Sequence, residues 1–472
     1  MLLEERISKK YYLTWVQVAL LSGSCIVFYF FALDRSELRT RDEIRYAQVA
    51  REIVEGGDWV SLHLNGHPYW DKPPLFFWMI AFSSYLWQGF SSFSARFPSA
   101  FFGTLTVLMV FFIGKILYDS RVGFLSGLIL ATSFEFARFS TRANIDATLT
   151  FFTTASFFSF LQWYRWQKEG SARQKDVRRL SIYGFYGSMA LATLTKGPIG
   201  FIFPLMASLV FLLMQKDWRG IRGMCLLSGL GLFLAIVLSW YLPAAFKGGQ
   251  IFLNETLFHQ TVDYYSTGWD HPKPIYFYLT NFPADFLPWS LFLPGAMVYG
   301  YFEWARGRRE EVLFVFTWFI VIFLFLSFSG AKRNLYLLPL YPAASLIVSK
   351  LWGDFIFSQM KDFRREWISW PFYGLTGLVF VLGLIILLAI FKGFPSYLLG
   401  TLLVTVLLMG GSLVVLFLYR SKRYRSAFFL FVGIMAVGVF YIEHFLFLWD
   451  EQFKSARFIP DFIKGEFGLF FP

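Results

Sequence analysis

The chain has 472 residues, of which 56% are hydrophobic and only 16% are charged. This composition excludes an ordinary soluble domain, because such domains carry about 25% charged residues. The formal net charge of +12 does not predict nucleic-acid binding, since no basic soluble domain is present to carry such a surface. We interpret the charge as positive cytoplasmic loops together with an anionic lipid or phosphate ligand.

We predict an all-α integral membrane protein with about thirteen transmembrane helices, because a helix of about 20 apolar residues crosses a bilayer core of about 30 Å. The first span follows a charged N-terminus and is expected to be a retained signal anchor. The predicted spans cover about residues 14–33, 97–117, 122–138, 146–164, 180–195, 198–214, 223–246, 287–303, 312–329, 335–352, 371–391, 396–419 and 426–448.

The apolar piece Leu75–Trp87 is too short to span the bilayer, and its placement decides the topology. If it lies at the membrane surface and the N-terminus is cytoplasmic, every loop rich in Lys and Arg faces the cytoplasm, as the positive-inside rule requires. We therefore predict an interfacial or re-entrant helix here. These basic loops lie at about 165–179, 216–222, 306–309, 361–365 and 420–425.

Two large outer loops follow from this topology, at about 34–95 and 247–286. We expect residues 1–350 to form a catalytic transmembrane module, and residues 351–472 to form C-terminal transmembrane helices with a short outer tail. Ionisable residues near membrane depth are costly, so those that gather on one face are candidates for function. The outer loops are therefore where we look for chemistry.

The first outer loop begins with a helix signal. Thr40 and Glu43 fit a capping box, which predicts a helix over Arg41 to Glu55 that ends at the two glycines that follow. Asp42 then lies in the first turn, close to where the chain leaves the membrane. It is either a reactive carboxylate or, more simply, a partner of the helix dipole.

Lys72 is held between aromatic residues and the pair Pro73-Pro74. A lysine at this depth can bind a lipid phosphate as a point charge. The alternative is an interfacial lysine whose ammonium extends to water, which is common for an isolated residue. Other ionisable and aromatic residues fall on the same outer face at Arg138, Arg142, Asp146, Lys196, His259, Asp263, His271, Lys332, Arg333 and Tyr336.

A carboxylate, several cations and aromatic residues beside the outer leaflet suit a polyprenyl-phosphate-linked sugar donor. Cations stabilise the departing phosphate, and one carboxylate serves as general base for the acceptor hydroxyl. Single displacement inverts the anomeric centre. A divalent cation could bridge carboxylates and phosphate, although no ligand spacing supports one, and two cysteines make no metal site by themselves.

Several short motifs occur in order within about residues 30–350. They are Asp42-Glu43-Ile44-Arg45-Tyr46-Ala47, Ala50-Arg51-Glu52, Gly57-Asp58-Trp59, Leu64-Asn65-Gly66, Asp71-Lys72-Pro73-Pro74-Leu75, Ala95-Arg96-Phe97-Pro98-Ser99-Ala100, Leu194-Thr195-Lys196-Gly197-Pro198 and Lys332 to Pro339. Together they resemble the ArnT-like lipid A aminoarabinose transferases, within the protein-O-mannosyltransferase-like group of GT-C glycosyltransferases. The resemblance implies a GT-C bundle in the bacterial inner membrane, with its active site on the periplasmic side.

The resemblance also implies roles for individual residues. Asp42 matches the catalytic acidic residue, Lys72 the lysine that binds polyprenyl phosphate, Tyr336 a phosphate-contacting tyrosine, and Asp146 an acidic residue of the cavity. We therefore expect Asp42 and Asp146 to be catalytic. Asp71 stands where the family usually has Glu, and His259 stands where it has an arginine. We further expect donor-phosphate contacts from Lys332, Arg333 and His259, and supporting roles for Glu43, Arg45, Arg142 and His271.

Besides a non-catalytic role in assembly or anchoring, two functions stay open at this point. The first is transfer of a sugar from a polyprenyl phosphate to a lipid A-like lipid, another glycan or a protein. The second is transport of a lipid-linked sugar, for which we would expect repeated halves with interrupted helices near the middle of the membrane. The C-terminal soluble domain of many relatives is missing from the sequence, which leaves the acceptor less defined than the donor.

Overall fold

The computed structural model describes residues 2–31, 33–34, 36–38, 40–169, 175–266, 271–358, 360, 363–393 and 398–441. The chain divides into two compact units, Met1–Ile368 and Ser369–Pro472. The end of the last predicted span and the predicted outer tail, residues 442–472, lie outside the described residues.

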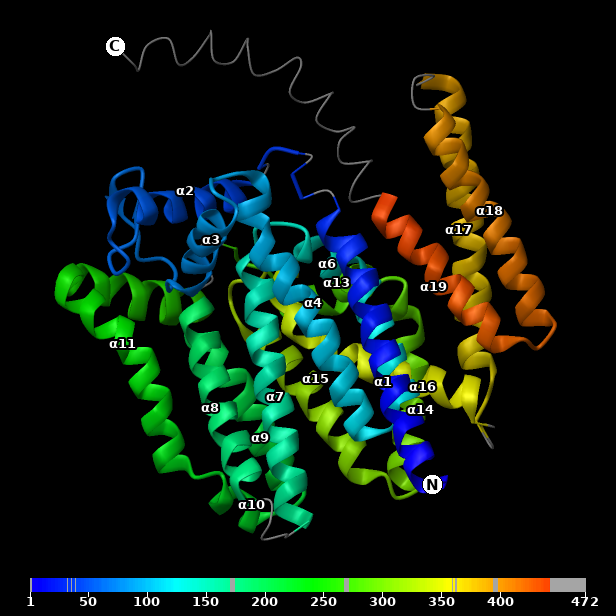
Figure 1. Ribbon diagram of the computed structural model, residues 1–472, viewed down its shortest axis with the longest axis horizontal. Helices are drawn as coiled ribbons and strands as arrows, with labels where there is room; N and C mark the ends of the chain where they lie inside the picture. Colours follow the sequence, from blue (N-terminus) through cyan, green and yellow to red (C-terminus); the bar gives the residue numbers. More distant parts are fainter. Residues whose placement is uncertain are drawn as a thin grey trace. The chain divides into compact units, whose positions relative to one another are not determined.

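The first unit is a bundle of helices with an elaborate cap at one end. Its main helices are α1 (Leu2–Cys25), α4 (Ser92–Leu117), α5 (Ser120–Ala131), α6 (Phe134–Ser140), α7 (Ile145–Glu169), α8 (Lys175–Lys196), α9 (Ile199–Met214), α11 (Leu226–Leu253), α14 (Leu293–Ala305), α15 (Arg309–Phe328) and α16 (Tyr341–Phe357). Helix α7 packs against both α4 and α8, and Figure 1 shows these three running side by side.

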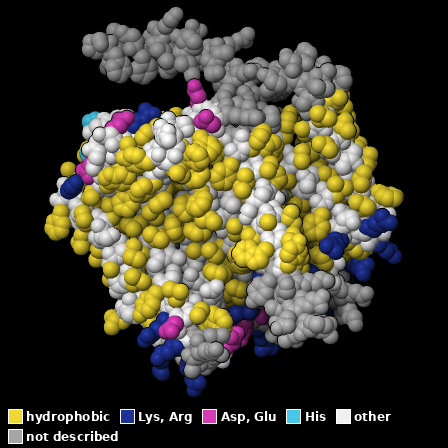
Figure 2. All heavy atoms as spheres, viewed as in Figure 1, with side chains coloured by type: hydrophobic (Ala, Val, Ile, Leu, Met, Phe, Trp, Pro, Cys, Tyr) yellow, Lys and Arg dark blue, Asp and Glu magenta, His cyan; other side chains and the backbone are white. Residues whose placement is uncertain are grey.

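The second unit contains most of α17 (Glu366–Gly393), together with α18 (Leu398–Arg420) and α19 (Tyr424–Tyr441). Helices α18 and α19 pack against each other. The described residues of each of the thirteen predicted spans are mostly helical, so the all-α interpretation is confirmed. Figure 2 shows apolar side chains across much of the visible surface, with Lys and Arg gathered toward its edges.

Eight helices of the described chain are apolar and long enough to cross a membrane, and the bent pair α5–α6 would add a ninth. The predicted spans on α7, α8, α9 and α14 fall outside this set. Several of these helices are short or carry polar residues along their length. The total of thirteen spans therefore stays a prediction, whereas a multi-pass membrane fold is established.

The first outer loop folds into a small cap. Helix α2 (Arg41–Gly56) buries one face, at Tyr46, Val49 and Ile53, against α3 (Leu75–Leu86), as expected for apolar residues at helical spacing. Strands β1 (His63–Leu64) and β2 (His67–Pro68) form a hairpin through a turn at Asn65-Gly66, both with positive φ. In Figure 1, α2 and α3 lie across one end of the bundle.

Helix α3 has only 12 residues, too few to cross a bilayer core. It packs against α2 and α4. The second outer loop follows a kink in α11 at Gly249, whose φ of 56° and ψ of −142° interrupt the helix. Its short helical segments are η3 (Asn254–Asp263), α12 (Tyr264–Ser266) and α13 (Phe277–Asp285).

Candidate active site

Asp42 lies in the first turn of α2, where the sequence places it. The predicted capping box is confirmed: the Glu43 amide donates to Thr40 Oγ1 at 3.2 Å, and the Thr40 amide donates to Glu43 Oε2 at 3.5 Å. The cap starts the helix at a defined residue, because it satisfies amides that have no partner within the helix. It therefore fixes the direction in which the Asp42 side chain leaves the backbone.

Both carboxylate oxygens of Asp42 accept a hydrogen bond from a guanidinium group. Arg45, one turn along α2, donates to Oδ1 at 2.7 Å, and Arg333 donates to Oδ2 at 2.9 Å. Burial favours the neutral acid, but the two guanidinium groups outweigh it, so the pKa of Asp42 lies below its ordinary value. Asp42 is therefore an ionised carboxylate at neutral pH.

Glu43 is directed into the fold and holds it together. Its Oε1 accepts from Arg96 Nε at 2.9 Å and from the Ala143 amide at 3.1 Å. Arg96 also donates to the carbonyls of Leu33, Ser36 and Glu37, each at 2.8 Å. Glu43 thus supports the site indirectly, by fixing the chain between the first span and α2.

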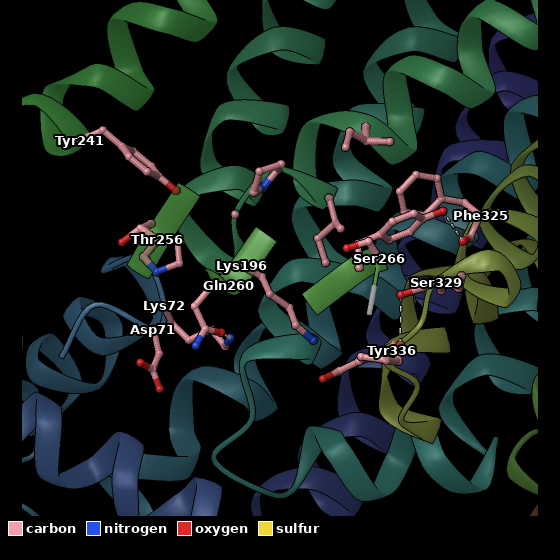
Figure 3. Close-up of a pocket in the computed structure, with 18 residues that line it drawn as sticks. Asp71, Lys72, Lys196, Tyr241, Thr256, Gln260, Ser266, Phe325, Ser329 and Tyr336 are labelled. Atoms are coloured by element: carbon pink, nitrogen blue, oxygen red, sulfur yellow. Dashed lines mark hydrogen bonds between the residues drawn. The ribbon is translucent and has the colours of Figure 1, made fainter. Parts of the chain in front are cut away.

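A pocket with a volume of about 440 Å³ opens below the cap. Lys72 and Lys196 both line it, and Tyr336 lies beside Lys196 (Figure 3). Two cations in a largely apolar cavity form a site for an anion with an apolar body. The pocket is lined by Asp71, Lys72, Pro73, Lys196, Gly197, Pro198, Ile199, Ile202, Tyr241, Thr256, Gln260, Tyr265, Ser266, Phe325, Leu326, Ser329, Ala331 and Tyr336.

Lys72 is half-buried at the edge of the pocket and donates to Gln260 Oε1 at 3.2 Å. Burial, followed by the nearby charge of Lys196, lowers the pKa of Lys72 to about 8. Glu255 Oε1 accepts from Gln260 and lies 3.0 Å from His259 Nδ1. His259 is thereby joined to the site through Glu255, but it is not among the residues that line the pocket.

Lys196 ends α8 and forms an ion pair with Asp146, the second residue of α7. Its ammonium also lies 4.1 Å from the centre of the Tyr336 ring, within range of a cation–π interaction. Asp146 is buried, and its amide donates to Asn144 Oδ1 at 2.7 Å. Asp146 therefore orients Lys196 in the pocket, an arrangement that the sequence interpretation did not include.

Arg333 and Tyr336 reach the site from the segment after α15. The segment is anchored on both sides, since Tyr278 donates to the Arg333 carbonyl at 3.2 Å and Asn334 donates to Asp285 Oδ1 at 3.1 Å. Asp285, at the end of α13, is 6% exposed. The backbone that presents Arg333 to Asp42 is thus held in place.

Lys332 is used differently from its prediction as a phosphate ligand. The residue is only 3% exposed. Its ammonium donates to the carbonyls of Ser329 and Lys273, the latter at 3.0 Å. Its own amide donates to the His271 carbonyl at 3.0 Å. Lys332 and His271 therefore join the two outer segments through the backbone, and neither lines the pocket.

Arg142 lies between α6 and α7, half-buried, and is likewise not among the residues that line the pocket. Of the residues predicted from sequence, Arg45 and Arg333 each contact Asp42. Lys72 and Tyr336 line the pocket, together with Lys196. Lys196 lies on the predicted outer face, at a helix end beside Gly197-Pro198 and within one of the motifs that carry the resemblance, but no separate role for it followed from the sequence.

No group of three or more His, Cys, Asp or Glu side chains in the described part of the chain is arranged to hold a metal ion. The carboxylates at the site are instead engaged by cations, as the Asp42 and Asp146 pairs show. The protein side chains thus offer no ready ligand set, and a bridging divalent cation stays a hypothesis.

Residues 36–251 match the family model described as dolichyl-phosphate-mannose-protein mannosyltransferase. The chain is 30% identical over 325 residues to the undecaprenyl phosphate-alpha-4-amino-4-deoxy-L-arabinose arabinosyl transferase of Pseudomonas aeruginosa, covering 68% of this chain and 57% of that protein. It is 29% identical to the Pectobacterium atrosepticum enzyme of the same name, covering 76% of this chain and 63% of that protein. This chain is ArnT-like. It spans less than two thirds of the length of these relatives.

The fold of the ArnT-like chain agrees with this conclusion. The crystal structure of ArnT from Cupriavidus metallidurans bound to undecaprenyl phosphate is similar, with a TM-score of 0.75, 22% identity, and coverage of 91% of this chain and 77% of that one. The oligosaccharyltransferase of Archaeoglobus fulgidus is more distant, with a TM-score of 0.54, 12% identity, and coverage of 77% and 53%. The expected GT-C architecture is thereby confirmed.

Proposed function

We propose that this ArnT-like chain is a membrane glycosyltransferase that moves a sugar from a polyprenyl-phosphate donor to an acceptor. The observation that supports this most strongly is the position of an ionised carboxylate, Asp42, next to a pocket that presents Lys72 and Lys196 in apolar surroundings. The similarity to proteins named as undecaprenyl-phosphate-dependent transferases supports the same donor class.

The donor phosphate lies between the ammonium groups of Lys72 and Lys196, with Tyr336 as a further contact. Point charges suit a phosphate whose negative charge grows as it leaves. The polyprenyl chain follows the apolar wall of the pocket, which includes Ile202 and Phe325. The protein thus separates a charged end for the phosphate from an apolar path for the lipid.

Asp42 acts as general base for the acceptor hydroxyl. As its carboxylate takes the proton, the hydroxyl oxygen forms a bond to the anomeric carbon, and the bond from that carbon to the phosphate oxygen breaks. The electron pair stays on the polyprenyl phosphate, where Lys72 and Lys196 stabilise it. One displacement inverts the configuration of the sugar.

The reaction takes place at the periplasmic face of the bacterial inner membrane. This placement follows from the positive-inside rule, because the basic loops then face the cytoplasm and the cap of α2 and α3 faces outward. The acceptor is a lipid A-like lipid, another glycan or a protein.

Sugar transfer by the purified protein in detergent or liposomes tests the proposal. A polyprenyl-phosphate sugar would be supplied with a lipid A-like lipid, a glycan or a peptide acceptor. We expect Asp42→Asn to lower turnover by about 10²- to 10⁴-fold, the contribution of a general base, while the variant still binds donor. Glu55→Gln, an exposed change on the same helix, is the matched control and keeps full activity.

Two results would contradict the proposal. Unchanged turnover in Asp42→Asn removes Asp42 from the role of base. Movement of lipid-linked sugar across liposomes without transfer to any acceptor would instead support a transporter.

A further inference from the structure

Two guanidinium groups hold and stabilise the Asp42 carboxylate, and this lowers its strength as a base. Its Oδ1 and Oδ2 already accept hydrogen bonds from Arg45 and Arg333, and the carboxylate is only 17% exposed. A general base must come within about 2.6–3.2 Å of the hydroxyl oxygen. Each oxygen keeps one lone pair for the hydroxyl, but withdrawal of one guanidinium group would make Asp42 both more accessible and a stronger base.

Arg45 is the less suitable group to move. It lies on the same helix as Asp42, one turn further along, and makes the shorter contact at 2.7 Å. Its guanidinium also lies 5.5 Å from the Tyr46 ring centre and 5.9 Å from that of Tyr69, so cation–π interactions hold it in place. Arg45 therefore keeps Asp42 oriented.

Arg333 has the features of the group that moves. Its contact to Asp42 bridges two distant segments of the chain, whereas its exposed fraction of 35% is close to the 33% of Arg45. The backbone around it is anchored, so a change of partner requires side-chain rotation only. Ser329, Ala331 and Tyr336 of the same segment line the pocket, and the charge of Arg333 acts on Lys196 inside it.

We propose that Arg333 is a positioning residue that exchanges the Asp42 carboxylate for the donor phosphate. While the pocket is empty, Arg333 covers Asp42 Oδ2. When a polyprenyl phosphate binds, its oxygens compete for the guanidinium, for which phosphate and carboxylate are equally suited partners. Asp42 Oδ2 is then released to the acceptor hydroxyl. The inference rests on the proposed function. It adds an order of events, in which donor binding comes first and makes Asp42 available as the base.

The exchange has an electrostatic consequence. With Arg333 withdrawn and a phosphate anion nearby, Asp42 becomes a stronger base in the donor complex than in the free protein. The remaining charged and titratable groups that act on Asp42 come from four elements of the cap and bundle. They are Arg45, Tyr46, Tyr69, Asp146 and Lys196.

A double-mutant cycle on donor binding tests the exchange without requiring turnover. Binding of polyprenyl phosphate to purified protein is measured for the wild type, Asp42→Asn, Arg333→Gln and the double variant. Asp42→Asn releases Arg333 to the phosphate, so we expect affinity to rise at least about fivefold, within the usual range of coupling between two sites. In the Arg333→Gln background the same change should raise affinity clearly less.

Asp71→Asn is the matched control, because it also removes a carboxylate beside the pocket. If removal of a carboxylate acts only through long-range charge, it raises the affinity for polyprenyl phosphate by the same factor in the wild-type and Arg333→Gln backgrounds. We expect this result for Asp71→Asn. The same equal rise for Asp42→Asn would overturn the exchange, and so would a fall in affinity. Absence of polyprenyl-phosphate binding in every variant, with folding intact, would overturn the exchange and the proposed donor together.

The pH dependence of turnover gives a second test. The acid limb of kcat/KM for the donor reports the free protein, and that of kcat reports the donor complex. We expect the limb of kcat to lie about one pH unit higher in the wild type, since loss of a guanidinium partner raises the pKa of a carboxyl. In Arg333→Gln, the pH difference between the acid limbs of kcat and kcat/KM should be smaller. An unchanged difference would contradict the exchange even if sugar transfer itself is confirmed.

Discussion

Lys72 carries its charge in surroundings that disfavour it. Burial and the neighbouring Lys196 lower the pKa of its ammonium to about 8, and Gln260 is a neutral partner. A bound phosphate would remove this conflict, because an opposite charge favours the ammonium form. The pocket therefore offers a site that favours an anion.

Donor affinity should consequently depend on pH. As the pH rises through about 8, Lys72 loses its proton and its attraction for the donor phosphate, so we expect binding to weaken. Lys72→Arg stays charged and should show a smaller decline, measured by equilibrium binding of polyprenyl phosphate between pH 6 and pH 9.5. Lys247→Gln, outside the pocket and exposed, is the control. A decline as steep in Lys72→Arg as in the wild type would assign the titration to another group.

At the level of elements, the cap on the bundle depends on one buried ion pair. Arg96 of α4 is 4% exposed, and Glu43 of α2 is 2% exposed. Arg96 binds Glu43 and the carbonyls of Leu33, Ser36 and Glu37, and Glu43 binds the Ala143 amide before α7. The start of α2, and with it Asp42, is positioned by these bonds.

Arg96→Met should therefore destabilise the fold. Removing one partner of a buried pair leaves an uncompensated charge, which costs about 3–5 kcal/mol. We expect a lower thermal midpoint in detergent and faster hydrogen exchange in the first outer loop. Arg51→Met, on an exposed position of α2, removes only a cation–π contact to Phe90 and should cost about 1 kcal/mol or less. Equal thermal midpoints for Arg96→Met and Arg51→Met would show that the ion pair of Arg96 and Glu43 does not stabilise the cap.

At the scale of the whole molecule, the orientation in the membrane depends on helix α3. If α3 lies at the surface, the α9–α10 loop is cytoplasmic, with α10 at Trp218–Gly223; if α3 spans, that loop lies outside. The 12 residues of α3 and the positive-inside rule both favour the surface position.

Cysteine labelling tests this orientation. In a Cys225→Ser background, chosen because Cys225 is exposed and Cys25 is buried, we expect Glu55→Cys to react with an impermeant reagent in intact cells. Arg219→Cys should react only after the membrane is opened. Labelling of Arg219→Cys in intact cells would show that α3 crosses the membrane.

Much of this protein could be predicted from its sequence. Composition and apolar segments identify a multi-pass all-α membrane fold, because transfer of a segment into lipid depends on its own residues. The capping box at Thr40 and the turn at Asn65-Gly66 were also predictable, since both are formed by neighbours in the chain. Ordered motifs predicted the ArnT-like relationship.

The partners within the site were decided by the tertiary structure. Asp42 meets Arg333 from 291 residues away, Lys196 meets Asp146 across two helices, and Lys332 is taken up by backbone carbonyls instead of the pocket. Spacing along the chain carries no information on which of several cations near one membrane face will share a cavity. That choice depends on how the helices pack and on where each backbone segment is anchored, so it exists only in the folded molecule.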